Sequence, residues 1–222
     1  MDDFVWKKTL RSQNLAFSNQ KLNLRNLKLL FYMKEHRNQN PQAGDLLLSE
    51  PFLTDDNFSR AVILLCEHEE GIGSVGFVMN KPSILSLGDL VSELDFLDAE
   101  VFVGGPVEQN TLHFVYFGLQ LMEESKPLGN DVWWGGDFSE LIQLINSKKM
   151  NLSQVRFFIG YSGWSPGQLN AELSAQSWIV YSDPLSQELF ANSSDQLWRS
   201  LMKSMGGDFE IQSNYPIDPR LN

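Results

Sequence analysis

The stretch from Ser59 to Pro82, SRAVILLCEHEEGIGSVGFVMNKP, contains two apolar runs separated by a short acidic segment that carries glycines. Residues 61–66 are almost continuously apolar and are β-branched at Val62 and Ile63, which indicates a strand covered on both faces. Residues 75–79 form the second run, and the short connection EHEEGIGS favours an antiparallel hairpin. We expect this hairpin to anchor a sheet.

Further strands and helices are expected on both sides of the hairpin. Apolar or β-branched runs predict strands at residues 46–49, 100–103, 111–117, 155–161 and 177–182. Helices are predicted at residues 87–94, after the D-x-x-E start at Asp137, and from Ser194 to the glycines at 206–207. This order is neither a regular βαβ alternation nor all-β, so we predict one α+β domain with a largely antiparallel sheet.

Composition limits the classes of function. The 222 residues are 42% hydrophobic, which is enough for one substantial core. The formal net charge of -11 opposes contact with phosphate backbones, so direct nucleic-acid binding is disfavoured. The only cysteine, Cys66, excludes an intrachain disulfide and fits a cytoplasmic location. No apolar run approaches the roughly 18 residues that span a bilayer, and no membrane association is expected.

The first 32 residues differ in charge from the rest. They carry six Lys and Arg against two Asp, whereas residues 33–222 carry 11 basic and 26 acidic residues. The segment could be a basic amphipathic arm around KLNLRNLKLLFY or an extension upstream of a true start at Met33. We favour the extension, because residues 33–51, MKEHRNQNPQAGDLLLSEP, read as a polar lead-in to the first strand. The domain is then expected to span residues 33–222.

Residues 163–167, GWSPG, match G-x-S-x-G, the nucleophile elbow of α/β-hydrolases. Pro166 follows the serine and lacks the N–H that an oxyanion hole needs, and all three histidines precede Ser165, whereas the triad histidine should follow it. We instead expect Ser165 to cap a helix, with Pro166 at the first helical position and Gln168 completing an S-x-x-Q capping box.

The expected helix start is a candidate ligand site. Leu169 and Leu173 recur at i, i+4 spacing and should face the core, while Gln168 and Glu172 share a neighbouring face as a solvated polar pair. The positive end of the helix, beside Trp164, is suited to an anion or a planar ligand.

Two other motifs have simpler interpretations. Residues 71–76, GIGSVG, match G-x-G-x-x-G, but a strand follows where the dinucleotide fingerprint requires a helix, so we interpret them as a hairpin turn. Residues 67–70, EHEE, offer metal-ligand atoms without an H-E-x-x-H motif or paired cysteines, and a solvated acidic turn is favoured. No metal and no cofactor is predicted.

Arg60 and Asn80 flank the two hairpin strands, and antiparallel pairing should bring them together. They could share the rim of a ligand pocket. Equally, Arg60 could pair with Asp55 or Asp56, and Asn80 could serve the turn that follows. The Gly-Gly-Pro turn at residues 104–106 allows close backbone approach, either to a ligand or to a neighbouring strand.

Taken together, residues 44–82, 101–107, 112–117 and 159–180 closely resemble the YqgE/AlgH family of bacterial proteins. The resemblance spans about residues 44–198 and implies a compact α+β fold built around a strongly coiled antiparallel sheet with flanking helices. The family has no assigned catalytic residues. Its AlgH name reflects an association with transcriptional control of alginate production, and the fold has no recognised DNA-binding motif.

The resemblance carries a set of motif residues over to this chain: Arg60, Glu67, His68, Asn80, Pro82, Gly104, Gly105, Pro106, Val107, Gly160, Tyr161, Gly163, Trp164, Gly167, Gln168 and Glu172. Many relatives continue the GGPV element with an R-G-F type sequence. This chain instead has EQNTLHF, which places His113 in the following strand.

The first functional hypothesis is a non-enzymatic binding or regulatory protein that acts through an unknown small molecule or protein partner. Its cleft should join the hairpin ends, the Gly104 turn and the helix start, with ligand contacts from Arg60, His68, Asn80, Gly104, Gly105, His113, Trp164, Gln168 and Glu172. The alternative is a hydrolase-like enzyme with His68 or His113 as base and Arg60 stabilising negative charge, although no nucleophile is apparent. A regulator that binds DNA directly ranks third, because it requires a concentrated basic face.

Overall fold

The computed structural model describes residues 40–91, 94, 97, 99–182, 189–190 and 194–216. The basic segment at residues 1–32 lies outside these ranges, and the domain boundary at Met33 stays a prediction. Within the described residues, no helix combines the length and the apolar character that a membrane span requires.

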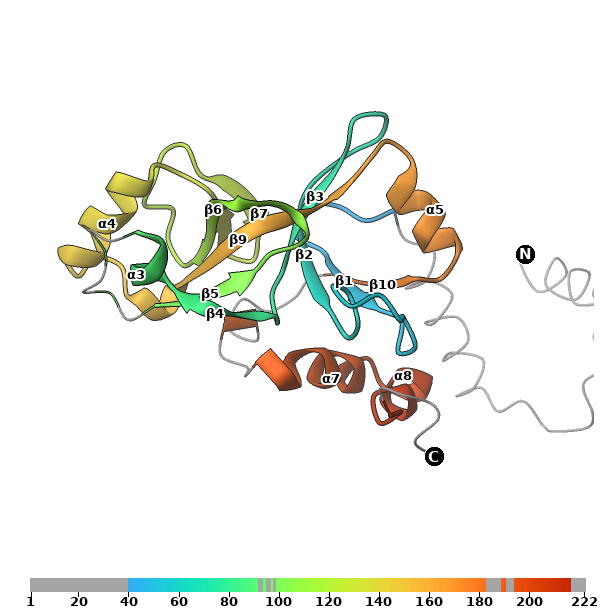
Figure 1. Ribbon diagram of the computed structural model, residues 1–222. Helices are drawn as coiled ribbons and strands as arrows, with labels where there is room; N and C mark the ends of the chain where they lie inside the picture. Colours follow the sequence, from blue (N-terminus) through green and yellow to red (C-terminus); the bar gives the residue numbers. More distant parts are fainter. Residues whose placement is uncertain are drawn as a thin grey trace, which may run out of the picture. The chain divides into compact units, whose positions relative to one another are not determined.

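The hairpin predicted from the sequence lies in the middle of the sheet (Figure 1). Strand β2 (Val62–Glu69) pairs antiparallel with β3 (Gly73–Val78), and a β-bulge shifts the register between Leu65 and Glu67. The first five residues of β2 are buried, which confirms a strand covered on both faces.

The described strands form one sheet in the order β10-β1-β2-β3-β9-β6-β8-β7, with β5 added beside β9 and β4 beside β5. The pairing of β5 with β9 is parallel and the other pairings are antiparallel, which confirms the predicted α+β class. The remaining strands are β1 (Leu46–Ser49), β4 (Pro82–Ser86), β5 (Glu100–Val103), β6 (Val107–Phe117), β7 (Lys126–Gly129), β8 (Val132–Trp134), β9 (Val155–Trp164) and β10 (Trp178–Tyr181).

Strand β9 connects the two parts of the sheet. Its last residues pair with β3, with Ser162 opposite Gly76, while its first residues lie between β5 and β6. Gly160 marks the change, because its φ of +63° is left-handed and a Cβ atom there would lie 2.6 Å from the carbonyl oxygen of Val107. The sheet coils about this strand.

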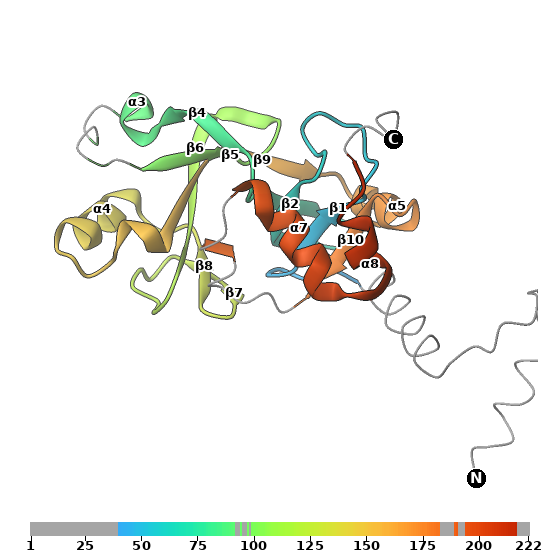
Figure 2. The same cartoon turned by 90° about the horizontal axis from the view of Figure 1, so that it is seen from below.

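The helices are α3 (Leu87–Leu90), α4 (Phe138–Asn146), α5 (Gln168–Ser174), α7 (Ser194–Met205) and α8 (Gly207–Gln212). Figures 1 and 2 show α7 and α8 on one face of the β10-β1-β2 region and α5 on the other. Leu169 of α5 packs with Leu47 and Ile63, whereas Trp198 of α7 donates its indole N–H to the carbonyl of Ser49 at 3.0 Å. These two layers explain why β2 is apolar on both sides.

The sequence predicted most of these elements. Asp137 caps α4 by accepting a hydrogen bond from the backbone N–H of Glu140 at 2.8 Å, which confirms the D-x-x-E start. Helix α3 ends at Leu90 and is shorter than predicted, β6 begins four residues earlier, and β9 continues to Trp164. The 3-10 helix at Leu152–Gln154 and the elements β4, β7, β8 and α8 were not predicted.

Candidate functional site

The structure distributes the predicted site residues between two ends of the hairpin. Arg60 precedes β2 and lies beside Asn80, whereas His68 lies near the other end of β2, opposite Ser74. Eight residues of extended chain separate Arg60 from His68, which corresponds to about 26 Å. The single cleft expected to join both ends is therefore not formed. Two separate hollows take its place. We call the hollow at the hairpin turn, lined by residues such as Ile72 and Ser74, the tip cleft, and the hollow at the open end of the hairpin, lined by residues such as Arg60 and Arg199, the base groove.

The tip cleft has a volume of about 520 Å³ and lies between the hairpin turn and the end of β9. Its walls come from residues of the 67–75 segment and from Tyr161 to Pro166, with Val107 completing the lining. Ile72, at the tip of the hairpin, is 72% exposed. The cleft thus combines the turn of the hairpin with the chain entering α5, which is part of what the first hypothesis expected, and it does not include the Gly104 turn.

Glu172 fixes two tryptophan rings in the core next to this cleft. Its Oε2 atom accepts hydrogen bonds from the indole N–H groups of Trp164, at 2.9 Å, and Trp178, at 2.7 Å. Its Oε1 atom accepts from the side-chain amide of Gln168 at 3.0 Å. The predicted Gln168 and Glu172 pair is present, but Glu172 is more than a solvated partner, because it holds two buried rings in place.

The predicted cap of α5 is wrong in part. The helix begins at Gln168, and its N-cap is Gly167 in a left-handed conformation with φ of +75°. The side chain of Gln168 does accept a hydrogen bond from the backbone N–H of Ser165, at 3.0 Å, as in a capping box. The reciprocal bond is replaced by a turn in which the Ser165 carbonyl accepts from the Gln168 N–H. Because Gly167 can adopt φ above zero, the chain makes this turn before the helix starts.

His68 contacts a serine that the sequence analysis did not identify. Its Nδ1 atom lies 2.8 Å from the hydroxyl oxygen of Ser74, which lines the tip cleft and is 6% exposed. This cross-strand pair follows from the hairpin register, since His68 is opposite Ser74. No hydrogen bond from the other ring nitrogen to a carboxylate occurs among the described residues. The pair thus supplies two parts of a catalytic triad without the third.

His113 lies on β6, away from the lining of the tip cleft. Its Nε2 atom is 2.8 Å from the hydroxyl oxygen of Thr111, and its ring centroid is 5.2 Å from that of Phe77 and 6.0 Å from that of Tyr161. Burial lowers the pKa of His113, and the charge of Glu108 acts in the opposite direction. His113 therefore contributes to packing behind Tyr161.

Gly104 and Gly105 meet the neighbouring strand. A Cβ atom on Gly104 would lie 2.4 Å from the carbonyl oxygen of Gly160, and one on Gly105 would lie 2.3 Å from the backbone of Tyr161. The Gly104 carbonyl also accepts hydrogen bonds from the backbone N–H of Val78 and the hydroxyl of Ser162. Of the two interpretations of this turn, the geometry supports close approach to β9.

Arg60 and Asn80 are adjacent, as the hairpin predicts. The Asn80 amide donates to the carbonyl of Arg60 and accepts from the backbone N–H of Val62, both at 2.8 Å. The Arg60 guanidinium does not pair with Asp55 or Asp56. It donates to the carbonyl of Tyr215 instead, and this arrangement belongs to the base groove.

Comparison with known proteins gives a consistent result. The model of the AlgH-like family, DUF179, matches residues 46–210. A UPF0301 protein from Cytophaga hutchinsonii is 42% identical over 180 residues, which cover 81% of this chain and 98% of the relative. One from Chlorobaculum parvum is 36% identical, with coverage of 82% and 96%.

Two solved structures share the fold at 23% identity. A crystal structure of a Corynebacterium diphtheriae protein has a TM-score of 0.68 and covers 80% of this chain and 94% of that chain. The solution structure of the AlgH protein from Pseudomonas aeruginosa has a TM-score of 0.62, with coverage of 80% and 96%. Both likenesses support the α+β fold.

Proposed function

The chain belongs to the AlgH-like family, and from this we propose that it is a non-enzymatic binding protein of regulatory type, whose ligand or protein partner is recognised in the tip cleft. The observation that carries the proposal is the tip cleft itself, a hollow of about 520 Å³ whose lining includes the partly exposed Tyr161 and the exposed Ile72. Glu172 holds the buried Trp164 ring in the core next to the cleft, and Tyr161 supplies the aromatic side chain of the lining. Preorganised aromatic side chains bind partners with little loss of conformational entropy.

The chemistry of the rim suggests what the cleft recognises. Ile72 offers an exposed apolar contact at the hairpin tip. Glu69 lines the cleft and has no ion pair among the described residues, while Glu67 is paired with Lys126 at 2.9 Å. A ligand with an apolar part and a positive charge would complement this surface. An effect on transcription would then be indirect, because the formal net charge of -11 opposes contact with DNA.

Surface variants of the full chain test the proposal without disturbing the core. Ile72→Ser and Glu69→Lys change the cleft, and Leu119→Ser is a matched control because Leu119 is 81% exposed and lies outside the cleft lining. The protein is purified gently from cells and examined by native mass spectrometry and by cross-linking. We expect a bound species that the parent and Leu119→Ser retain and that both cleft variants lose. Equal recovery from all four proteins would contradict the proposal.

The Ser74 and His68 contact supports a second candidate, a hydrolase with Ser74 as nucleophile and His68 as base. We rank it lower, because Ser74 is buried within a paired strand and the described residues supply no acid to orient His68. A fluorophosphonate probe separates the two candidates. If the probe labels the parent but neither Ser74→Ala nor His68→Gln, the enzyme is favoured. If the protein only binds a partner, the probe should label the parent no more than it labels Ser74→Ala.

A further inference from the structure

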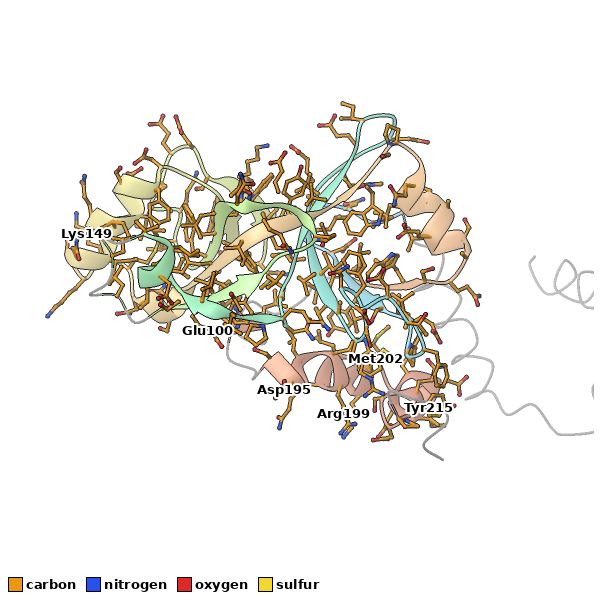
Figure 3. The ribbon with its side chains drawn as sticks, in the orientation of Figure 1. Glu100, Lys149, Asp195, Arg199, Met202 and Tyr215 are labelled. Carbon is orange, nitrogen blue, oxygen red and sulfur yellow. The ribbon has the colours of Figure 1, made fainter. Side chains whose placement is uncertain are left out.

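The base groove is a hollow of about 490 Å³ that the proposed function does not use. It lies between the end of the hairpin opposite its turn and the start of α7. Its lining includes Arg60, Asn80, Lys81, Asp195, Trp198 and Arg199. Figure 3 places Asp195 and Arg199 along α7 and Tyr215 close to α8. We propose that this groove binds a small phosphate-bearing molecule.

The groove concentrates positive charge in an acidic protein. Arg60, Lys81 and Arg199 line it together, whereas the whole chain has a formal net charge of -11. None of the three makes an ion pair with a residue that the structure describes. The ion pair found among those residues joins Lys126 to Glu67, outside the groove. Like charges held close together repel one another, as Arg199 and Arg60 do, and a bound anion would relieve this repulsion.

The environment of the cations supports this interpretation. Burial lowers the pKa of Arg60, and the neighbouring charge of Arg199 lowers it further. Burial also lowers the pKa of Lys81, against the opposing charges of Asp55 and Asp56. The groove therefore holds cations that are partly removed from water, where an anion interacts with them more strongly than at an open surface.

Neutral groups hold the two guanidinium groups in position. Arg60 donates from Nη2 to the carbonyl of Tyr215, and Arg199 donates from Nε to the carbonyl of Ser213 at 3.1 Å. The Arg60 guanidinium also lies over the ring of Trp198, 4.9 Å from its centroid. These contacts orient both groups without adding a negative charge, which is the preorganisation that guanidinium recognition of an oxyanion requires.

Arg60 also retains an unused donor. Its Nε atom is buried and makes no hydrogen bond among the described residues. A buried N–H group without an acceptor is unfavourable, and structures usually satisfy such groups with protein, water or ligand. The atom is closed off from solvent, so an oxygen atom of a bound phosphate group would satisfy this donor once the Arg60 side chain turns toward the groove.

Charge and size together define the ligand class. The neighbouring guanidinium groups of Arg60 and Arg199 match the dianion of a phosphate monoester near neutral pH, while Asp195 lines the groove and Asp55 and Asp56 act on Lys81. The volume of about 490 Å³ exceeds what a lone phosphate group needs and lies in the range of small-molecule sites. Pro82, which is exposed, offers an apolar contact for the organic part of such a molecule.

Calorimetric titration of the full chain with phenyl phosphate and with inorganic phosphate tests the proposal. Arg199→Gln and Lys81→Gln each remove one charge from an exposed or half-buried side chain, and Lys203→Gln is the control on α7 outside the groove. We expect each groove variant to weaken phenyl phosphate binding about tenfold and the control to change it less than about twofold. Arg60→Gln would also remove the bond to Tyr215, and Arg199→Gln removes the bond to Ser213, so thermal unfolding of each variant is measured and Lys81→Gln carries the test if Arg199→Gln is destabilised.

The outcomes separate this proposal from its alternatives. Tighter binding of phenyl phosphate than of inorganic phosphate supports a phosphate monoester, and equal binding assigns the groove to free phosphate. No binding of either compound at millimolar concentration, or binding that survives in both groove variants, overturns the proposal. Ile72→Ser should bind phenyl phosphate as the parent does, so failure of the tip-cleft proposal leaves this result unaffected.

Discussion

A single carboxylate, Glu172, organises the aromatic side chains next to the tip cleft. It accepts hydrogen bonds from two indole N–H groups and one side-chain amide, so three donors depend on one residue. Its i, i+4 spacing from Gln168 is visible in the sequence. Its contacts with Trp164 and Trp178 are not, because they depend on how α5 packs against β9 and β10.

We expect Glu172→Leu to destabilise the fold by about 3 kcal/mol, since it leaves two indole N–H groups without their charged acceptor. Glu172→Gln keeps an acceptor oxygen and should lose only about 1 kcal/mol. Urea unfolding followed by tryptophan fluorescence measures both values. If Glu172→Leu lost less than Glu172→Gln, the carboxylate would not be the group that stabilises Trp164 and Trp178.

His113 should make stability depend on pH. Burial lowers its pKa in the folded state below the ordinary value of 6.5, so the unfolded chain takes up the proton more readily. Its contribution is therefore complete above about pH 6.5 and is lost as the pH falls through the folded pKa. We expect the stability advantage of the parent over His113→Gln to shrink between pH 7.5 and pH 5. An NMR titration that gave His113 a pKa above 6.5 would contradict this.

At the scale of elements, structure that depends on neighbouring residues was predicted well, and structure that depends on long-range geometry was predicted poorly. The β2–β3 hairpin and the Asp137 cap rest on residues close in sequence, and both are present. The edge strand β4 has no such pattern, because it is largely exposed and Ile84 is fully so. The cap at Ser165 failed because the left-handed conformation of Gly167 set the helix start, which the S-x-x-Q pattern does not encode.

The junction of β5 with β9 gives a test at this scale. Gly104→Ala would place a Cβ atom 2.4 Å from the carbonyl oxygen of Gly160 and force the strands apart. We expect a loss of about 2 kcal/mol or more in the free energy of unfolding. Gly163→Ala is the matched control on β9, because the nearest atom, 3.2 Å away, belongs to the side chain of Tyr161. A Gly104→Ala protein as stable as the control would mean that this turn tolerates a side chain.

At the scale of the whole molecule, the sequence predicted one cleft, whereas Trp164 lines the tip cleft and Arg60 and Asn80 line the base groove. Arg60 and His68 both belong to the hairpin, and only the length of β2 shows that they lie at opposite ends. The net charge of -11 likewise conceals the base groove, because an average over the chain says nothing about where Lys81 and Arg199 lie. Both errors concern the positions of residues in the folded chain, which composition and local sequence patterns do not give.

The reactivity of Cys66 can report on unfolding of the whole molecule. Cys66 is the only cysteine, is 3% exposed and lies in β2 between two packed layers. Burial, and then the charge of Glu67, raises the pKa of its thiol, which disfavours the reactive thiolate. We expect the folded protein to react with a thiol reagent about a thousandfold or more slowly than the unfolded chain, since labelling requires global opening.

The dependence of this labelling rate on urea distinguishes global from local opening. If β2 is exposed only when the sheet as a whole unfolds, the logarithm of the rate should rise with urea with the same slope as the unfolding equilibrium constant. A control protein with Ser165→Cys and Cys66→Ala carries its thiol at an exposed position in the tip cleft and should react quickly without urea. A shallow slope for Cys66 would show that the hairpin opens separately, and the sheet would then be less cooperative than its continuous pairing from β10 to β7 implies.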